Sequence, residues 1–314
     1  MAVKMTDLKD TNRLLLEAVL VPVQGTRFQP TGFPNLGAAT FPRSDGGQML
    51  LVESAQSMAN HLEGVCWDEQ RTDLVEELTG LPYVRVLDKD GVMITNSILE
   101  SHRINSPYIL EGKDKSFVDI LREETAATSD SPIDIPKLAN VVFKYDPNAV
   151  LHGVFISKSD VGGGRLRLQR VLSGFIEADN VYPAESGGVK LDRVNPTGDT
   201  GKGFGHVPFH RTEFVAESIK AYFNLDLATL RAYNLGQDAE ELLVNIAIWK
   251  IRRLLSNGMR LRTACDLKAK ELLVTKPDGF TVPDEISVAS AIRAGIEKCA
   301  GKFADPLLTD VVWG

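Results

Sequence analysis

The chain has 314 residues, of which 43% are hydrophobic and 25% are charged, and its formal net charge is −7. This composition is ordinary for a soluble globular protein, and the acidic balance argues against a general nucleic-acid binder. No window approaches about 18 uninterrupted apolar residues and the N-terminus has no hydrophobic core segment, so we expect neither a membrane span nor a secretory signal.

The first predicted elements are a strand over 13–22, a long loop over 24–48 and a helix over 54–66. Both alternating faces of 13–22 are largely apolar, which predicts a strand buried on both faces. The helix carries Ala55, Met58, Ala59 and Leu62 on one stripe. The loop is rich in glycine, proline, arginine and phenylalanine. A connection of this length indicates a binding segment.

Residues 68–133 are predicted to be an acidic insertion built from small elements. We expect helices over 68–79, 97–104 and 116–124, a β-hairpin over 83–94 that turns at Asp88–Gly91, and a polar break over 125–133. Asp134 is a good N-cap for a helix that ends at Lys144.

The second half alternates strands with helices. We predict strands over 149–157, 165–170, 171–178, 218–227 and 259–267, helices over 237–255 and 284–299, and an irregular Gly-rich region over 183–211. Without the insertions the order is β-α-β-β-α-β, which predicts an α+β fold of the ferredoxin-like or RNA-recognition-motif type. In that fold helices cover one sheet face and the other face is free to bind.

Charge is segregated along the chain. Residues 53–146 hold nine Lys/Arg against eighteen Asp/Glu, a balance of −9, whereas residues 244–276 hold eight against two, a balance of +6. Such an asymmetry can build a track for a polyanion on an acidic body, although charge runs are more often solvated surface. The three cysteines are far apart and show no metal-ligand spacing with the five histidines. We therefore expect a reducing cytoplasm and no zinc site.

The sequence contains no complete nucleotide-binding motif. In residues 197–205, TGDTGKGFG, Lys202 is followed by Gly203 rather than Ser or Thr, and no GxGxxG joins a strand to a helix. His206 and His210 lie near Arg211, but no nucleophile or paired carboxylate accompanies them. We expect no catalytic site and no cofactor or metal.

Basic and aromatic residues on the two long loops and the middle strands are the candidate RNA-binding residues, because single-strand binding combines cations with planar groups. The predicted phosphate contacts are Arg27, Arg43, Lys158, Arg165, Arg167, Arg170, Lys202 and Arg211. The predicted stacking groups are Phe28, Phe204 and Phe209, and His210 is a further contact residue. Taken singly, each of these sites is more simply read as a loop anchor or an ion pair.

Long blocks of the sequence resemble the backbone subunit of type I CRISPR effector complexes (Cascade), of the variety called type I-G, formerly I-U. They include LLLEAVLVPVQGTRFQPTGFPNLGAATF, LHGVFISKS and GGVKLDRVNPTGDTGKGFGHVPFHRTEF, and the resemblance covers roughly 13–275. It implies a non-enzymatic subunit with a modified RNA-recognition fold. Several copies would stack head-to-tail along the spacer of a CRISPR RNA, together with other subunits, and leave its bases free to pair with target DNA.

The same resemblance implies a palm (1–67 and 134–314), fingers (68–133) and a thumb within about 183–211. The acidity of the chain departs from what a filament on RNA would favour. Two alternatives stay open: a CRISPR RNA-processing endoribonuclease that uses His206 or His210, and a protein-interaction scaffold without RNA.

Overall fold

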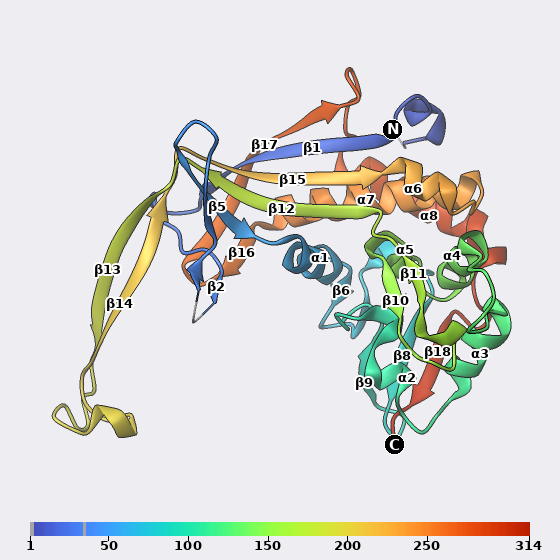
Figure 1. Ribbon diagram of the computed structural model, residues 1–314, viewed down its shortest axis with the longest axis horizontal. Coiled ribbons are helices and arrows are strands. Elements are labelled where there is room, and N and C mark those ends of the chain that lie inside the picture. Colours follow the sequence, from blue (N-terminus) through green and yellow to red (C-terminus); the bar gives the residue numbers. More distant parts are fainter. Residues whose placement is uncertain (1–2, 34–35) are drawn as a thin grey trace.

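An antiparallel sheet of seven strands forms the centre of the computed structural model, which describes residues 3–33 and 36–314 (Figure 1). The spatial order of the strands is β16-β17-β1-β15-β12-β5-β4. Their bounds are β1 (Arg13–Pro22), β4 (Thr40–Pro42), β5 (Gln48–Glu53), β12 (Leu172–Asp179), β15 (Ser218–Asp226), β16 (Met259–Arg262) and β17 (Cys265–Lys276). The first strand in the chain is thus a central strand, between β17 and β15.

Helices cover one face of this sheet. Leu14, Leu16, Ala18 and Leu20 are at most 2% exposed, on the face where α1 (Ala55–Gly64) and α7 (Gln237–Asn257) pack, and α8 (Glu285–Cys299) packs on α7. The intervening residues of β1 are only half-buried. The prediction that β1 is buried on both faces is therefore wrong, because both helical crossovers lie on the same side.

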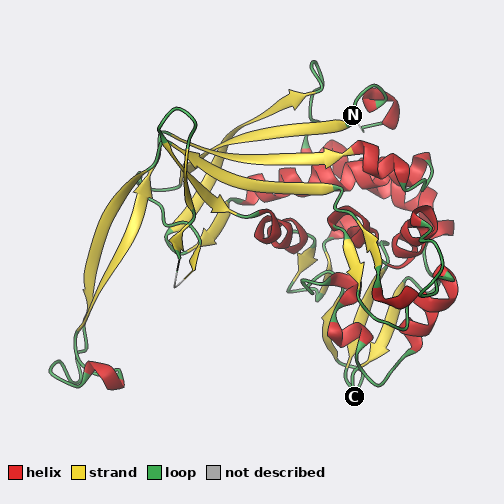
Figure 2. Ribbon diagram, in the orientation of Figure 1, coloured by secondary structure: helices red, strands yellow, loops and turns green. Residues whose placement is uncertain are grey.

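A two-stranded arm extends from one end of the sheet (Figure 1). Its strands β13 (Tyr182–Lys190) and β14 (Val207–Val215) pair antiparallel over nine residues, from Tyr182 opposite Val215 to Lys190 opposite Val207. At the tip lies the short 3₁₀ turn η5 (Thr200–Lys202), which Figure 2 shows as the helix beyond the two strands. The prediction of an irregular region over 183–211 is wrong for both of these strands.

A mixed lobe, formed by residues 67–168 and the last strand of the chain, lies at the other end of the sheet (Figure 1). Its three-stranded sheet pairs β8 with β9 antiparallel and with β18 in parallel. The elements are β6 (Trp67–Asp68), β7 (Asp73–Leu74), β8 (Tyr83–Leu87), β9 (Met93–Asn96), α2 (Pro107–Leu110), α3 (Ser116–Thr125), α4 (Ile135–Tyr145), α5 (Pro147–His152), β10 (Val154–Ile156), β11 (Leu166–Leu168) and β18 (Leu308–Val312).

Short elements complete the described chain. They are the strands β2 (Gly32–Phe33) and β3 (Gly37–Ala38), the helix α6 (Leu227–Ala232) and the 3₁₀ turns η1 (Met5–Leu8), η2 (Glu76–Leu78), η3 (Arg103–Asn105), η4 (Gly162–Gly164) and η6 (Ala300–Lys302). Pro34 and Asn35 of the predicted loop lie outside the described residues. Within residues 3–33 and 36–314, no helix is long and apolar enough to cross a bilayer.

The predicted α+β class is confirmed, as are the strands at 13–22, 171–178 and 218–227, the 83–94 hairpin and the helices at 54–66, 116–124, 134–144, 237–255 and 284–299, within a residue or two at most ends. Three elements are wrong. Residues 68–79 form a small bridge and a 3₁₀ turn, 97–104 are mostly turns, and 149–157 begin as helix α5. The strand predicted over 259–267 is instead a hairpin, in which β16 covers 259–262, the chain turns at 263–264 and β17 begins at Cys265.

Candidate nucleic-acid interface

One face of the arm gathers a phenylalanine and two arginines. In the β13–β14 ladder Arg211 lies opposite Ser186 and Phe209 lies opposite Gly188, so the side chains of Phe209 and Arg211 emerge on the same face. Gly188 leaves room for the ring, since a Cβ at that position would lie 2.9 Å from an atom of Phe209. Phe209 is 49% exposed. The ring is thus fixed on the arm and open to solvent.

Glu213 holds the two arginines of this face. Its carboxylate is almost fully buried, and lies 3.2 Å from Nη1 of Arg27 and 2.9 Å from Nη2 of Arg211. It also accepts a hydrogen bond of 3.0 Å from Oγ of Ser186. Two guanidinium groups share one carboxylate, so one positive charge remains uncompensated beside Phe209. The arginine side chains are 55% and 40% exposed, which leaves them accessible to an anion.

Phe28 anchors the first loop to the base of the arm. Its backbone N–H donates to the carbonyl of Phe214 at 3.0 Å, and its carbonyl accepts from the N–H of Phe214 at 2.8 Å. This bridge turns the ring inward, where it is only 1% exposed. The prediction that Phe28 stacks on a base is wrong.

The tip of the arm is folded around one carboxylate. Asp192 accepts hydrogen bonds from the backbone N–H groups of Val194, Asn195 and Gly205 at 2.8–3.0 Å, and these bonds lower the pKa of its carboxyl group. Lys202 and Phe204 project from this tip, and Phe204 is half exposed. Both predicted residues are therefore available for contact with a ligand.

The two histidines of the arm have local partners. His210 lies on the face opposite to Arg211, where its Nε2 is 2.7 Å from Glu185. Nδ1 of His206 accepts a hydrogen bond of 3.0 Å from the backbone N–H of Asp192. The structure does not bring them together on one face of the arm with Arg211 and Arg27.

Three predicted cations are engaged by neighbours, two of them in ion pairs and one with backbone carbonyls. Arg43 bonds both Asp45 and Asp179, and its side-chain hydrogen bond lowers the pKa of Asp45 to about 2. Lys158 lies 2.5 Å from Glu111. The guanidinium of Arg165 donates to the backbone carbonyls of Thr128 and Ser131 in the polar segment over 125–133.

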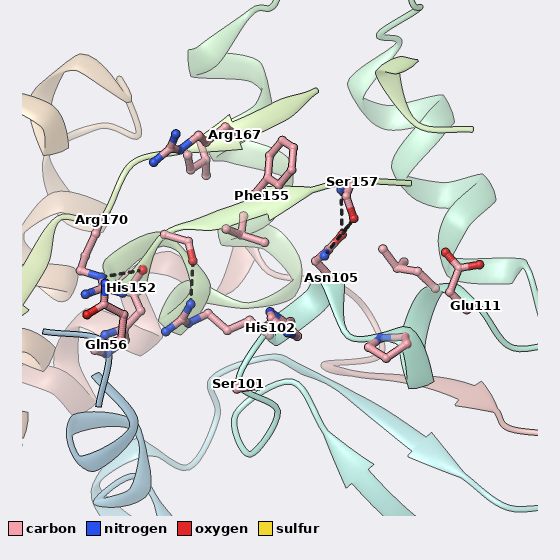
Figure 3. Close-up of a pocket in the computed structure, with 16 residues that line it drawn as sticks. Gln56, Ser101, His102, Asn105, Glu111, His152, Phe155, Ser157, Arg167 and Arg170 are labelled. Atoms are coloured by element: carbon pink, nitrogen blue, oxygen red, sulfur yellow. Dashed lines mark hydrogen bonds between the residues drawn. The ribbon is translucent and has the colours of Figure 1, made fainter. Parts of the chain in front are cut away.

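The other two predicted arginines line a cleft of about 840 Å³ in the lobe (Figure 3). Arg167 is exposed on β11. Arg170 is half-buried and fixed, because its Nη1 donates to the carbonyl of Ala55 at 2.8 Å and its Nε donates to that of His152 at 3.3 Å. Burial and the neighbouring Arg103 lower the pKa of Arg170. His102 and Phe155 also line the cleft.

A buried polar network forms the back of this cleft. Arg103, which has a left-handed backbone (φ +55°), makes two hydrogen bonds of 2.7 and 2.8 Å to the carboxylate of Glu63 on α1. Lys250 of α7 is fully buried, donates to Oδ1 of Asn148 and lies 2.9 Å from Nε2 of His152. Burial, followed by the charge of Lys250, holds the pKa of His152 well below its ordinary value, so this histidine is neutral.

More than half of the chain matches a family of known proteins. Residues 14–183 match the family described as CRISPR-associated protein GSU0053. The chain belongs to this family. The resemblance to CRISPR-associated proteins predicted from the sequence is thereby confirmed.

Two solved structures are similar to this chain at low sequence identity. A chain of a "CRISPR RNA-guided surveillance complex, pre-nicking" is 11% identical with a TM-score of 0.42, over 92% of this chain and 89% of the other. Csc2 of Thermofilum pendens is 10% identical with a TM-score of 0.33, over 93% and 77%. No curated protein matches the sequence.

Sequence reasoning missed the residues that organise both regions of this CRISPR-associated protein. Glu213 was not singled out as an anchor, although its spacing of two from Arg211 on a strand would have placed both on one face. Phe155 falls within the strand predicted over 149–157, where nothing in the sequence distinguishes it from the apolar residues around it. No local signal marks Arg103 and Glu63, because they are 40 residues apart and meet only through the tertiary fold.

Proposed function

We propose that this CRISPR-associated protein binds CRISPR RNA along its spacer, as a multi-copy subunit of a type I effector complex of the I-G variety. The observation that carries the proposal is the arm face, where Arg27 and Arg211 share Glu213 beside the exposed ring of Phe209. An uncompensated cation next to a planar group suits a phosphate and a base of a single strand. Membership of a CRISPR-associated family is the reason for proposing CRISPR RNA as the ligand.

The sheet supports the proposal that the central part is a modified RNA-recognition palm. Its four long strands lie in the order β17-β1-β15-β12, and all are antiparallel. In chain order this is 4-1-3-2, with α1 before β12 and α7 before β17, as expected of a β-α-β-β-α-β unit. The arm then corresponds to the thumb, and the fingers predicted over 68–133 correspond to part of the lobe, which continues to residue 168 and includes β18.

The arm also suits assembly. It projects away from the sheet and ends in a folded tip with Val194 almost fully exposed. Such a projection can reach a neighbouring copy, and repetition of a heterologous contact builds an open helical array. We propose that copies stack head-to-tail in this way with other subunits of the complex, and that the guide then pairs with target DNA.

The proposal is tested by RNA binding and by microscopy. A labelled single-stranded guide RNA is titrated with the full chain, and the Arg27→Gln/Arg211→Gln double variant is compared with wild type. We expect weaker binding and a shallower dependence of log K on log salt, by about 0.7 for each phosphate that the variant no longer neutralises. Electron micrographs of wild type with RNA should show regular arrays. Wild-type protein that binds no RNA at low salt would refute the proposal.

We further propose that the subunit is not an enzyme. His210 pairs with Glu185, and Nδ1 of His206 is occupied by the backbone of Asp192. Incubation of the protein with labelled repeat RNA tests this directly. Specific cleavage that is lost in a His210→Ala variant would contradict it.

A further inference from the structure

The lobe contains a two-stranded ribbon whose central exposed residues form an aromatic–arginine pair. In β10 the pattern is buried, exposed, buried for Val154, Phe155 and Ile156, and β11 repeats it around Arg167. Phe155 lies directly opposite Arg167 in the ladder. Opposed residues of antiparallel strands have Cβ atoms about 5 Å apart on the same face. The two side chains therefore emerge on the same face of the ribbon, and Figure 3 shows both of them at the cleft.

Packing in the core does not explain why a phenylalanine occupies position 155. Its side chain is 51% exposed at the edge of the cleft, whereas its neighbours Val154 and Ile156 are at most 5% exposed in the core. A half-exposed aromatic ring beside a cleft offers a flat apolar surface to a ligand. The cleft volume of about 840 Å³ falls within the range of sites for small organic ligands.

The charge of the cleft favours an anion. Within the described residues, the ion pairs at its walls join Arg103 to Glu63 and Lys158 to Glu111. Arg170 donates to backbone carbonyls instead of to a carboxylate, and Arg167 has no ion pair among the residues described. The cleft therefore carries about two uncompensated positive charges, since arginine stays protonated in proteins. Arg170 is also held in place by its two carbonyl partners, which lowers the entropy cost of binding.

The opposite wall is polar, and one of its amide side chains is already engaged. Asn105 uses its amide on Ser157, with its Oδ1 accepting from the backbone N–H at 2.9 Å and its Nδ2 lying 3.3 Å from Oγ. His102 is exposed at the mouth. A ligand recognised through one ring face and a phosphate is a nucleotide unit, and stacking on an aromatic ring accepts any base.

Resting on the proposed function, we propose that this cleft binds one nucleotide unit of the single-stranded RNA, with its base stacked on Phe155 and its phosphate between Arg167 and Arg170. The site lies in the lobe, at the opposite end of the sheet from the arm face. It would hold the strand at a second point, independently of Arg27 and Arg211.

The test measures the affinity of the full chain for a labelled single-stranded RNA by fluorescence anisotropy. Phe155→Leu should weaken binding by a factor between about 5 and about 150, the effect of losing one stacked base. Phe155→Trp should retain affinity, because the larger ring preserves stacking. Tyr108→Leu, at a half-exposed aromatic of the same lobe that does not line the cleft, is the matched control and should bind as wild type.

The contribution of the Arg167 charge is tested by repeating the same titration at several salt concentrations. Arg167→Gln should weaken binding and reduce the slope of log K against log salt by about 0.7, whereas Phe155→Leu should leave the slope unchanged. Arg122→Gln on α3 is the charge control. RNA that carries 4-thiouridine should crosslink to the peptide containing Phe155.

The outcomes separate the two proposals. If wild type binds RNA while Phe155→Leu and Arg167→Gln bind like their controls, the nucleotide site is wrong and the proposed function stands. If wild type binds no RNA, both fail. If the crosslinks map only to the arm, the cleft is not a nucleotide site. Both substitutions are at exposed positions, so unchanged thermal unfolding should accompany them.

Discussion

The ion pair between Glu63 and Arg103 joins α1, beneath the sheet, to the lobe, and we predict that removing its carboxylate destabilises the protein strongly. The side chains are 4% and 9% exposed, and both carboxylate oxygens accept from the guanidinium. Glu63 also accepts from Nδ2 of Asn148 at 2.9 Å, and Arg103 donates to the carbonyl of Gly153 at 3.1 Å. The pair is therefore the centre of a buried network.

The size of the expected loss of unfolding free energy depends on whether one partner of the buried ion pair is removed or both are replaced. In Glu63→Leu the guanidinium stays buried without its anion, which costs about 3–5 kcal/mol of unfolding free energy. The amide of Asn148 also loses an acceptor. In the Glu63→Leu/Arg103→Leu double variant both charges are absent, so the loss should be clearly smaller than the sum of the two single losses.

Urea unfolding at neutral pH measures these differences, with the fluorescence of the three tryptophans as the signal. Glu63→Gln is the conservative control, since it removes the charge but keeps an oxygen acceptor. A loss below about 1 kcal/mol in Glu63→Leu, or strict additivity in the double variant, would refute the view that this pair holds the lobe to α1.

Three further predictions concern stability and the arm. Burial raises the pKa of Asp146 to about 6 against 3.8 for the ordinary carboxyl. The unfolded chain therefore loses its proton first, and stability should fall by about 3 kcal/mol as pH rises from about 4 to about 6; unfolding curves of Asp146→Asn over this range should lack the fall. Phe28→Ala should cost about 3–5 kcal/mol in urea unfolding because it empties a buried site; a loss near zero would contradict the anchoring role. Gly205 has φ +81° and faces the carbonyl of Gly198, so Gly205→Ala should disorder the tip and speed proteolysis between β13 and β14; an unchanged cleavage rate would count against a rigid tip.

The elements that the sequence predicted well are those whose signal is local. The helix at 237–257 repeats apolar residues over many turns, and the strand at 13–22 is a nearly continuous apolar run. The arm was missed because β13 contains Pro183, Gly187 and Gly188, which disfavour a strand. Pairing with β14, from across the arm tip, overrides that preference. Residues 68–79 have helical character, but the bridge between Trp67 and Leu74 and the buried Leu78 fix another path.

The sequence predicts which residue types form the candidate site. It does not predict which of those side chains are free to bind a ligand. Arg43, Lys158 and Arg211 look equivalent in the sequence. In the structure Arg43 is matched by Asp45 and Asp179, and Lys158 by Glu111, whereas Arg211 shares the carboxylate of Glu213 with Arg27. Asp179 and Glu111 lie far along the chain from the cations they compensate. The tertiary fold therefore decides which cations are available to a polyanion.

The same charge argument distinguishes two possible RNA surfaces. The helix-free face of the sheet carries Phe175 stacked on Tyr222, with ring centroids 5.1 Å apart, where a typical RNA-recognition sheet would hold bases. In the strand register, however, Tyr222 is flanked by Glu17 of β1, and Lys220, two residues away on the same face of β15, is paired with that glutamate at 3.0 Å. A phosphate there would have to compete with Glu17 for Lys220.

We therefore predict opposite results for two aromatic residues that look alike in the sequence. Tyr222→Leu should leave RNA affinity and its salt dependence unchanged, because the cation on its side of the sheet, Lys220, is already paired with Glu17. Phe155→Leu should weaken binding, because Arg167 stands beside it. Anisotropy titrations of both variants under one set of conditions decide between the surfaces. Loss of binding in Tyr222→Leu with none in Phe155→Leu would place the RNA on the open sheet face, and would mean that stacking outweighs the local charge.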